Sequence, residues 1–149
     1  PESSSSMTAW LEVSAPLMVS ALVGAHVVSR SWPLLTIRLM QHVGDVAGSK
    51  SKPLADQISA AALVTGFLWC LMALALIVSA QVATNFIAYG APDEGLLQAL
   101  LSALLWSGIA WAWMARWFWR RLGGFTGDCL GATQQVCELA FYLGLALSL

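Results

Sequence analysis

Charged residues are scarce in this sequence. Of its 149 residues, 10% are Asp, Glu, Lys or Arg, whereas a soluble domain usually carries about 25%. Hydrophobic residues make up 58% of the chain, a composition that is hard to reconcile with a surface facing water. The net charge of −1 argues against a nucleic-acid partner, because nucleic-acid binding needs a strongly basic surface.

Cysteine is also rare. The sequence contains no Cys-x-x-Cys pair among Cys70, Cys129 and Cys137, and its histidines lack the spacing of metal ligands. It therefore shows no zinc-binding motif. Cys129 and Cys137 lie on one predicted helix, about 12 Å apart along its axis, which is too far for a disulfide. Residues Pro1 to Ser6 lack an initiator Met and a basic segment. They are unlike a signal peptide, and we expect a polar loop of a longer protein.

Long apolar stretches dominate the rest of the chain. They are Met7 to Val28, Ile58 to Ala80, Leu96 to Trp119 and Cys129 to Leu149. Roughly 20 residues suffice to cross a bilayer, and a backbone in lipid must satisfy its own hydrogen bonds. The sequence therefore predicts an all-α fold, a polytopic transmembrane bundle of about four spans forming one membrane-embedded domain over residues 1–149. Pro33 predicts the end of the first helix, with Leu34 to Val43 lying at the interface.

The basic residues predict the orientation of these spans. They are Arg30, Arg38, Lys50, Lys52, Arg116, Arg120 and Arg121. One orientation places all of them on one face, which the positive-inside rule assigns to the cytoplasm. The loop with Asp93 and Glu94, which has no basic residue, then faces outside, as do both termini. An aromatic interfacial anchor is predicted at the end of the third stretch, formed by Trp111, Trp113, Trp117 and Trp119. The alternative is that these rings stack on a planar substrate.

The loop between the third and fourth stretches carries the candidate chemistry. Gly123, Gly124 and Gly127 permit positive φ and close approach of the backbone to a ligand. Free N–H groups at the start of the last helix suit a phosphate, and neighbouring arginines add charge. Asp128 is a hard oxygen ligand of the kind that Mg²⁺ needs. The same residues also fit an ordinary turn, in which two glycines end one helix and Asp128 caps the next.

A polar stripe continues down the last helix. Asp128, Gly131, Gln135 and Glu138 fall within about 80° of one another around a helix. Glu138 lies about 15 Å beyond Asp128, and a carboxylate so deep in a membrane costs several kcal/mol unless it is paired, protonated or solvated. Two interpretations remain open, a functional carboxylate and a carboxylate bonded to a neighbouring helix for packing.

The other polar residues are weaker candidates for a functional site. Arg30 suits a phosphate, although an arginine near a helix end often only extends toward the interface. Lys50 and Lys52 either contact phosphate or set the topology. His26 and His42 have no visible partner, and helix packing or an interfacial position is expected for both.

A ten-residue motif spans the loop and the start of the last helix. Residues 123–132 read Gly-Gly-Phe-Thr-Gly-Asp-Cys-Leu-Gly-Ala, and Glu138 follows. This motif closely resembles the Gly-Gly-x-Thr-Gly-Asp-x-Leu-Gly-Ala pattern of the cobalamin synthase family, and Ser29-Arg30 and Ser49 to Ala55 also match. The resemblance covers essentially the whole chain but only the second half of a family member. The family's preceding His-x-Asp-Gly-x-x-Asp motif does not occur in this sequence.

The resemblance implies a magnesium-dependent adenosylcobinamide-GDP ribazoletransferase of cobalamin biosynthesis, in the prokaryotic cytoplasmic (inner) membrane. In this reaction α-ribazole, or its 5′-phosphate, attacks the cobinamide-linked phosphorus of adenosylcobinamide-GDP, and GMP leaves. The implied catalytic residues are Asp128, which would also hold Mg²⁺, and Glu138. The expected substrate and phosphate contacts are Arg30, Lys50, Lys52, Arg121, Gly123, Gly124, Thr126 and Gly127.

Other functional classes remain open. One is a fragment of a transporter or channel, with Glu138 lining a pathway, and another is a non-catalytic membrane subunit. The Gly-rich break between the third and fourth stretches lies at the predicted membrane edge. A transporter would more often place such a break near mid-membrane, so this position favours the transferase. Expected partners are the two substrates and the lipid bilayer, and both a homo-oligomer and an association with a separate N-terminal half stay open. Because the Asp-rich motif is missing, the chain alone is expected to be catalytically incomplete.

Overall fold

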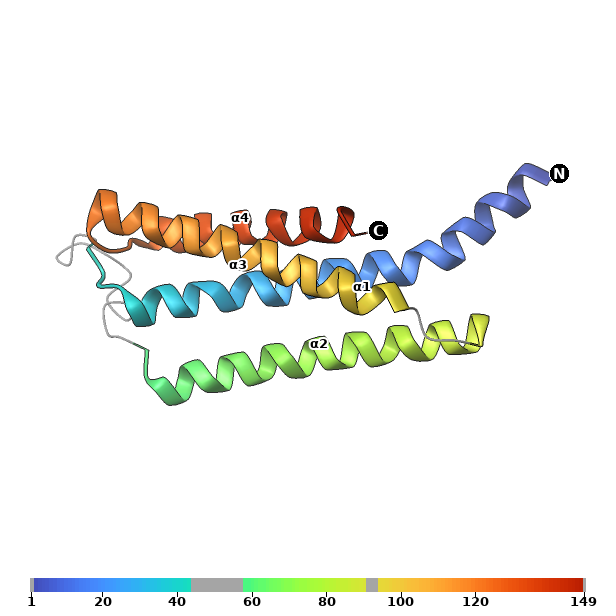
Figure 1. The fold of residues 1–149 in the computed structure, drawn as a ribbon, viewed down its shortest axis with the longest axis horizontal. Coiled ribbons are helices and arrows are strands. Elements are labelled where there is room, and N and C mark those ends of the chain that lie inside the picture. The colour runs from blue at the N-terminus through green and yellow to red at the C-terminus, as the bar shows by residue number, and fades with distance from the viewer. Residues whose placement is uncertain (1, 44–57, 91–93, 149) are drawn as a thin grey trace.

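Four helices run along one long axis (Figure 1). A computed structural model describes residues 2–43, 58–90 and 94–148. The helices are α1 (Glu2–Leu39), α2 (Ala60–Tyr89), α3 (Glu94–Leu122) and α4 (Gly127–Ala146). The described residues contain no strand beyond an isolated bridge between His42 and Phe125, so the predicted all-α fold is confirmed. α1 and α3 finish, and α2 and α4 begin, at the same end of the bundle, which is called the loop end below.

The helices differ in how well they suit a membrane. Among the described residues, Ala60–Tyr89 and Gly95–Leu122 are long and apolar enough to cross a bilayer. α4 falls short because Gln134, Gln135 and Glu138 lower its apolar character. All four predicted helices are present, while membrane crossing by α1 and α4 stays a prediction.

α1 does not break at Pro33. It continues to Leu39, so the expected helix end at Pro33 and the separate interfacial segment from Leu34 to Val43 are wrong. A proline in a helix leaves the carbonyl four residues earlier, here that of Ser29, without its N–H donor. Helices packed in a membrane protein tolerate this loss, because neighbouring helices and side chains hold the segment in place.

Contacts to α3 lie on both sides of that proline. The indole Nε1 of Trp32 donates to Oγ of Ser107 at 2.8 Å, and Nε1 of Trp111 donates to Oγ1 of Thr36 at 3.1 Å. The two indole rings stack with centroids 5.6 Å apart. Trp111 therefore packs between helices and does not belong to the predicted interfacial anchor, whereas Trp113, Trp117 and Trp119 are exposed.

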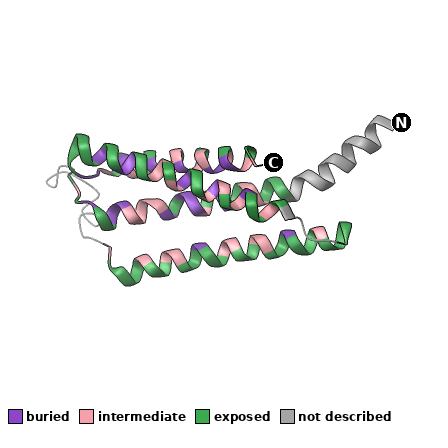
Figure 2. Ribbon diagram, in the orientation of Figure 1, coloured by how far each residue is buried: buried purple, intermediate pink, exposed green. Residues whose placement is uncertain are grey.

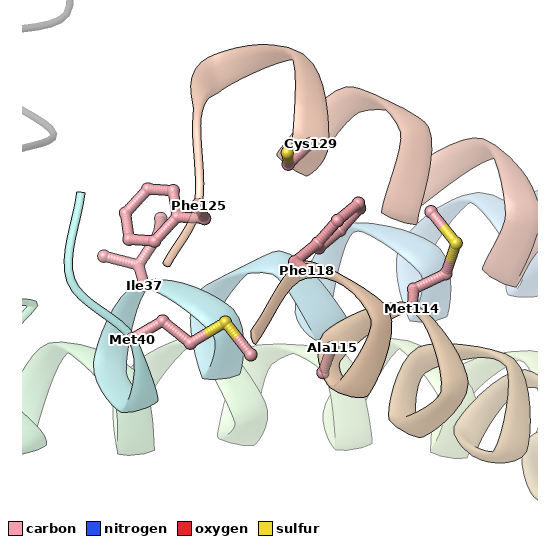
Figure 3. Close-up of a cluster of buried hydrophobic side chains, with 7 residues drawn as sticks. All are labelled: Ile37, Met40, Met114, Ala115, Phe118, Phe125 and Cys129. Carbon is pink, nitrogen blue, oxygen red and sulfur yellow. The ribbon is translucent and has the colours of Figure 1, made fainter. Parts of the chain in front are cut away.

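Buried side chains form two clusters between the helices, the first among α1, α3 and α4 and the second also reaching α2 (Figure 2). The cluster at the loop end contains Ile37, Met40, Met114, Ala115, Phe118, Phe125 and Cys129 (Figure 3). The second contains Ala25, Val28, Cys70, Ala103 and Phe141. Cys70, Cys129 and Cys137 are all buried, as expected for small side chains packed within helices, and none forms a disulfide.

α2 lies against α1 and leaves most of its surface open (Figures 1 and 2). Its buried residues are Cys70 and Gln81, and large apolar side chains such as Leu68, Leu76 and Ile87 are exposed. A helix with such an apolar surface suits lipid acyl chains better than water. The membrane setting predicted from composition therefore agrees with the arrangement of α2.

Candidate functional site

The loop between α3 and α4 is fastened to the end of α1. The backbone N–H of Phe125 donates to the carbonyl of Gln41 at 3.0 Å, and the N–H of Val43 donates to the carbonyl of Phe125 at 2.9 Å. The Phe125 side chain is 1% exposed and lies within the loop-end cluster (Figure 3). The start of α4 is thus held at a fixed position on the bundle.

Two glycines of the motif are explained by backbone geometry. Gly123 has φ +70°, and its N–H donates to the carbonyl of Trp119 at 3.1 Å, an arrangement that ends a helix. A Cβ on Gly124 would collide with the carbonyl oxygen of Gln41. A Cβ on Gly127 would meet nothing within 4 Å, as is also the case at Gly123, but Gly127 does not have a positive φ. The predicted phosphate contacts of these glycines stay predictions, and open space for a ligand is found at Gly127.

Thr126, and not Asp128, caps α4. Oγ1 of Thr126 accepts from the backbone N–H of Cys129 at 3.4 Å, so the interpretation of Asp128 as the cap is wrong. Asp128 lies exposed in the first turn of α4. Within the described ranges its carboxylate has no hydrogen-bond or ion-pair partner. An unengaged carboxylate beside free N–H groups at a helix start is available for a metal or a ligand.

The polar stripe on α4 lies on an open side of the bundle. Asp128, Gly131 and Gln135 are exposed and Glu138 is half-buried. The opposite side of α4 packs into the bundle through Cys129, Thr133, Cys137, Phe141 and Gly144. The predicted stripe is therefore a continuous accessible surface that begins at the loop end.

Glu138 has partners that its sequence position did not show. Its Oε1 lies 3.8 Å from Nδ1 of His26 on α1 and accepts from the hydroxyl of Tyr142 at 3.2 Å. The His26 contact is longer than a hydrogen bond and is an ion pair only when the imidazole is protonated. These partners stabilise a carboxylate that lies far along α4 from the loop end, and they leave Glu138 accessible on its exposed side.

Arg30 extends the open surface onto α1. It is exposed and lies one turn beyond His26 on the same face, toward the loop end. α4 runs antiparallel to α1 (Figure 1), and His26 lies beside Glu138. The α1 turn that carries Arg30 therefore lies alongside the earlier part of the stripe, between Gly131 and Gln135. Ser29 does not belong to this surface, since it is fully buried and its Oγ donates to the carbonyl of His26 at 3.1 Å.

The remaining predicted residues lie near the loop end or outside the described ranges. Arg121 is exposed in the last turn of α3. Lys50 and Lys52 fall between residues 44 and 57, outside the described residues. The structure thus brings Arg30, Asp128 and Glu138 to one surface and leaves the two lysines unplaced.

His42 was missed as a candidate. Its Nδ1 is buried and has no hydrogen-bond partner within the described ranges, and its ring meets Phe125 edge-on at 5.4 Å. A buried polar atom without a partner is uncommon in folded proteins and marks a place where a ligand or ion gains a contact. No local signal identified it, because Phe125 is distant in sequence and only the backbone bridge brings the two together.

The described residues offer a single exposed carboxylate, Asp128, to a magnesium ion at the start of α4. They contain no group of three or more His, Cys, Asp and Glu side chains suited to a metal, and Asp128 is the carboxylate at the start of α4. Magnesium usually takes one or two protein carboxylates and fills its other positions with water and phosphate oxygens. Asp128 can supply one such ligand, and a closed cage of protein ligands does not fit the described part of the chain.

Comparison with known proteins connects this site to one family. The model of the cobalamin-5-phosphate synthase family matches residues 4–146. A protein of Albidiferax ferrireducens called adenosylcobinamide-GDP ribazoletransferase is 75% identical over 137 residues, which cover 92% of this chain and 49% of that protein. Proteins of the same name from Polaromonas naphthalenivorans and Vibrio parahaemolyticus are 53% identical over 130 residues and 35% identical over 137 residues.

The matched region is a part of each relative. The alignments cover 87% of this chain and 42% of the Polaromonas protein, and 91% of this chain and 45% of the Vibrio protein. The chain thus spans about half the length of the curated relatives it matches. No solved structure matches it.

Proposed function

The chain belongs to the cobalamin-5-phosphate synthase family, which confirms the resemblance seen in its sequence, and on that premise we propose that it carries one wall of the active site of an adenosylcobinamide-GDP ribazoletransferase. The observation that carries this proposal is the open polar surface from Asp128 to Glu138, joined by Arg30 from α1. Family membership favours this transferase over the transporter or channel fragment considered as the alternative.

The proposed reaction is a phosphoryl transfer. The hydroxyl oxygen of α-ribazole, or of its 5′-phosphate, forms a bond to the cobinamide-linked phosphorus of adenosylcobinamide-GDP. The bond from that phosphorus to the GMP oxygen breaks, GMP takes the electron pair, and the hydroxyl proton is released. Such transfers depend on positioned positive charge and hydrogen-bond donors more than on a covalent nucleophile.

The loop end supplies the parts that this chemistry needs. Free N–H groups in the first turn of α4 face a phosphate favourably, and open space at Gly127 allows it to approach. Arg30 and Arg121 offer guanidinium groups for bidentate contacts with phosphate oxygens. Magnesium, when bound, neutralises charge on the transferring phosphorus. Asp128 is the described side chain that would hold it, together with substrate phosphates.

Glu138 has a separate proposed role. About 15 Å of helix separates it from Asp128, so the two carboxylates cannot act on the same phosphorus. A nucleotide-linked corrinoid is large enough to reach both. We assign Glu138 to contact with another part of the substrate, with His26 and Tyr142 holding its carboxylate in place.

The proposal includes a location. Arg38 lies in the last turn of α1, and Arg120 and Arg121 lie in the last turn of α3, so these cations gather at the loop end. The positive-inside rule then places this end in the cytoplasm and the protein in the prokaryotic cytoplasmic (inner) membrane. Nucleotide substrates would reach the start of α4 from that side.

A fusion protein tests the function. This chain would be joined to the remaining length of the Albidiferax ferrireducens relative, reconstituted in lipid, and supplied with adenosylcobinamide-GDP, α-ribazole and Mg²⁺. Release of GMP is expected, and Asp128→Asn should lower it by at least about tenfold, a loss of roughly 1.4 kcal/mol. Glu94→Gln, at the opposite end of α3, is the matched control and should stay within about twofold.

The chain without its fusion partner is the second arm. Little GMP release is expected from it, because its described part offers one wall and a single carboxylate at the loop end. Normal turnover of the Asp128→Asn fusion, with normal membrane insertion, would remove Asp128 from the site. A wild-type fusion that inserts but releases no GMP would refute the transferase assignment.

A further inference from the structure

A pocket of about 310 Å³ lies between the end of α1 and the last two turns of α3. Its walls are Leu39, Met40, Ala115, Arg116, Trp119 and Arg120. Figure 3 shows the Met40 side chain extending from α1 toward Ala115 on α3. Both of these residues are buried and belong to the loop-end cluster, so the inner wall of the pocket is apolar and well packed.

The outer wall is positively charged. Arg116 and Arg120 are one helical turn apart and therefore share a face of α3, and both are exposed. Within the part of the chain that the structure describes, neither guanidinium has an ion-pair or hydrogen-bond partner. Two unpaired guanidinium groups beside one pocket repel each other, and an anion between them relieves that repulsion and accepts charge-assisted hydrogen bonds.

The aromatic side chain limits the kind of anion. Trp119 is 59% exposed and borders the pocket, and its indole provides an apolar face and one N–H donor. Exposed Trp113 and Trp117 stack one turn apart on the same helix, which is typical of the bilayer interface. A small carboxylate or chloride would leave the apolar wall uncovered, whereas a phosphate ester with an apolar or aromatic body would cover it.

This pocket is separate from the surface proposed for catalysis. Leu39 follows Arg30 by nine residues, which at about 100° per residue places it about 180° around the axis of α1. The pocket thus opens on the side of α1 opposite to His26 and Arg30. A role for this pocket does not depend on the transferase reaction.

We propose that Arg116, Arg120 and Trp119 form a binding site for a phosphate ester that carries an apolar or aromatic group. The arginines bind the phosphate, and Met40 and Ala115 contact the apolar part. The same chemistry occurs in two sources, the headgroup and upper acyl chain of an anionic phospholipid and a soluble aromatic phosphate. The position at the end of a membrane-suited helix is accessible to either.

Direct binding to the purified 149-residue chain distinguishes these sources. Native mass spectrometry in detergent would compare dioleoyl phosphatidylglycerol with dioleoyl phosphatidylcholine, whose choline offsets the phosphate charge. Thermophoresis would measure binding of phenyl phosphate. Preference for phosphatidylglycerol identifies a lipid site, and saturable binding of phenyl phosphate identifies a soluble phosphate. Either result supports the proposal when the arginines are required for it.

Matched variants show whether the arginines act through this pocket. Arg116→Gln and Arg120→Gln should each weaken binding about tenfold, since a hydrogen bond to a charged group contributes about 1.5 kcal/mol or more. Arg38→Gln removes the same charge from the loop end at an exposed position that does not line the pocket. It should change binding less than about twofold.

A filling variant provides an independent measurement. Leu39→Trp enlarges an exposed wall residue, 61% accessible, and should weaken binding at unchanged net charge, with helical content checked by circular dichroism. The proposal is overturned if neither probe binds, if Arg38→Gln weakens binding as much as the pocket variants, or if folded Leu39→Trp binds normally.

Discussion

Nδ1 of His26 on α1 lies 3.8 Å from Oε1 of Glu138 on α4. The hydroxyl of Tyr142, one turn further along α4, donates to the same oxygen at 3.2 Å. The side chain of His26 is 52% exposed and that of Glu138 is 26% exposed. This polar group therefore joins two helices and remains accessible from one side, so packing and substrate contact are compatible roles for Glu138.

A double-mutant cycle should detect the coupling between these two residues. His26→Ala, Glu138→Gln and the double variant would be unfolded in detergent and followed by circular dichroism. We expect a coupling free energy of about 0.6 kcal/mol, the average for polar pairs between membrane helices. Tyr142→Phe should cost a similar amount. Additive effects of His26→Ala and Glu138→Gln would show that the contact contributes nothing to stability.

Gly124→Ala should disrupt the attachment of the loop to α1. The added methyl group collides with the carbonyl of Gln41, so we expect a loss of about 1–3 kcal/mol in the free energy of unfolding, as overpacking usually costs. Gly127→Ala is the control, because a Cβ there meets nothing within 4 Å. It should be neutral or slightly stabilising. Equal losses in both variants would contradict the attachment.

Ser107→Ala should weaken the contact between α1 and α3 beside Pro33. The variant leaves Nε1 of Trp32 without its acceptor, and an unpaired half-buried donor costs about 1 kcal/mol or more. Ser79→Ala is the matched control, since the Ser79 hydroxyl is exposed and donates to the carbonyl of Leu76 within its own helix. Thermal unfolding in detergent measures both. No difference between the two variants would contradict the proposed support of α1.

Labelling with an impermeant thiol reagent tests the orientation. On a background without native cysteines, Asp93→Cys should react from outside intact cells, and Lys50→Cys should react only after the membrane is opened. The physical reason is the gathering of cations at the loop end, which favours retention in the cytoplasm. The reverse labelling pattern would invert the proposed topology and move the start of α4 to the outside.

The amino-acid sequence by itself determined which segments are helical and which family they form. Apolar stretches of membrane length must satisfy their backbone hydrogen bonds internally, so four helices follow from composition and length, as found. The motif from Gly123 to Ala132 identified the family, because its residues are contiguous and its spacing is specific. The exposed position of Asp128 at the start of α4 also follows from that local order.

Tertiary structure decided which faces of the helices meet. Pro33 predicts a helix end locally, yet α1 continues, because Trp32 before the proline contacts Ser107 and Thr36 after it contacts Trp111. The partner of Glu138 is His26, and the pocket beside Arg116 forms only where α1 meets α3. These pairings join residues far apart in sequence and depend on the packing of whole helices, whereas helix formation depends on hydrogen bonds between near neighbours.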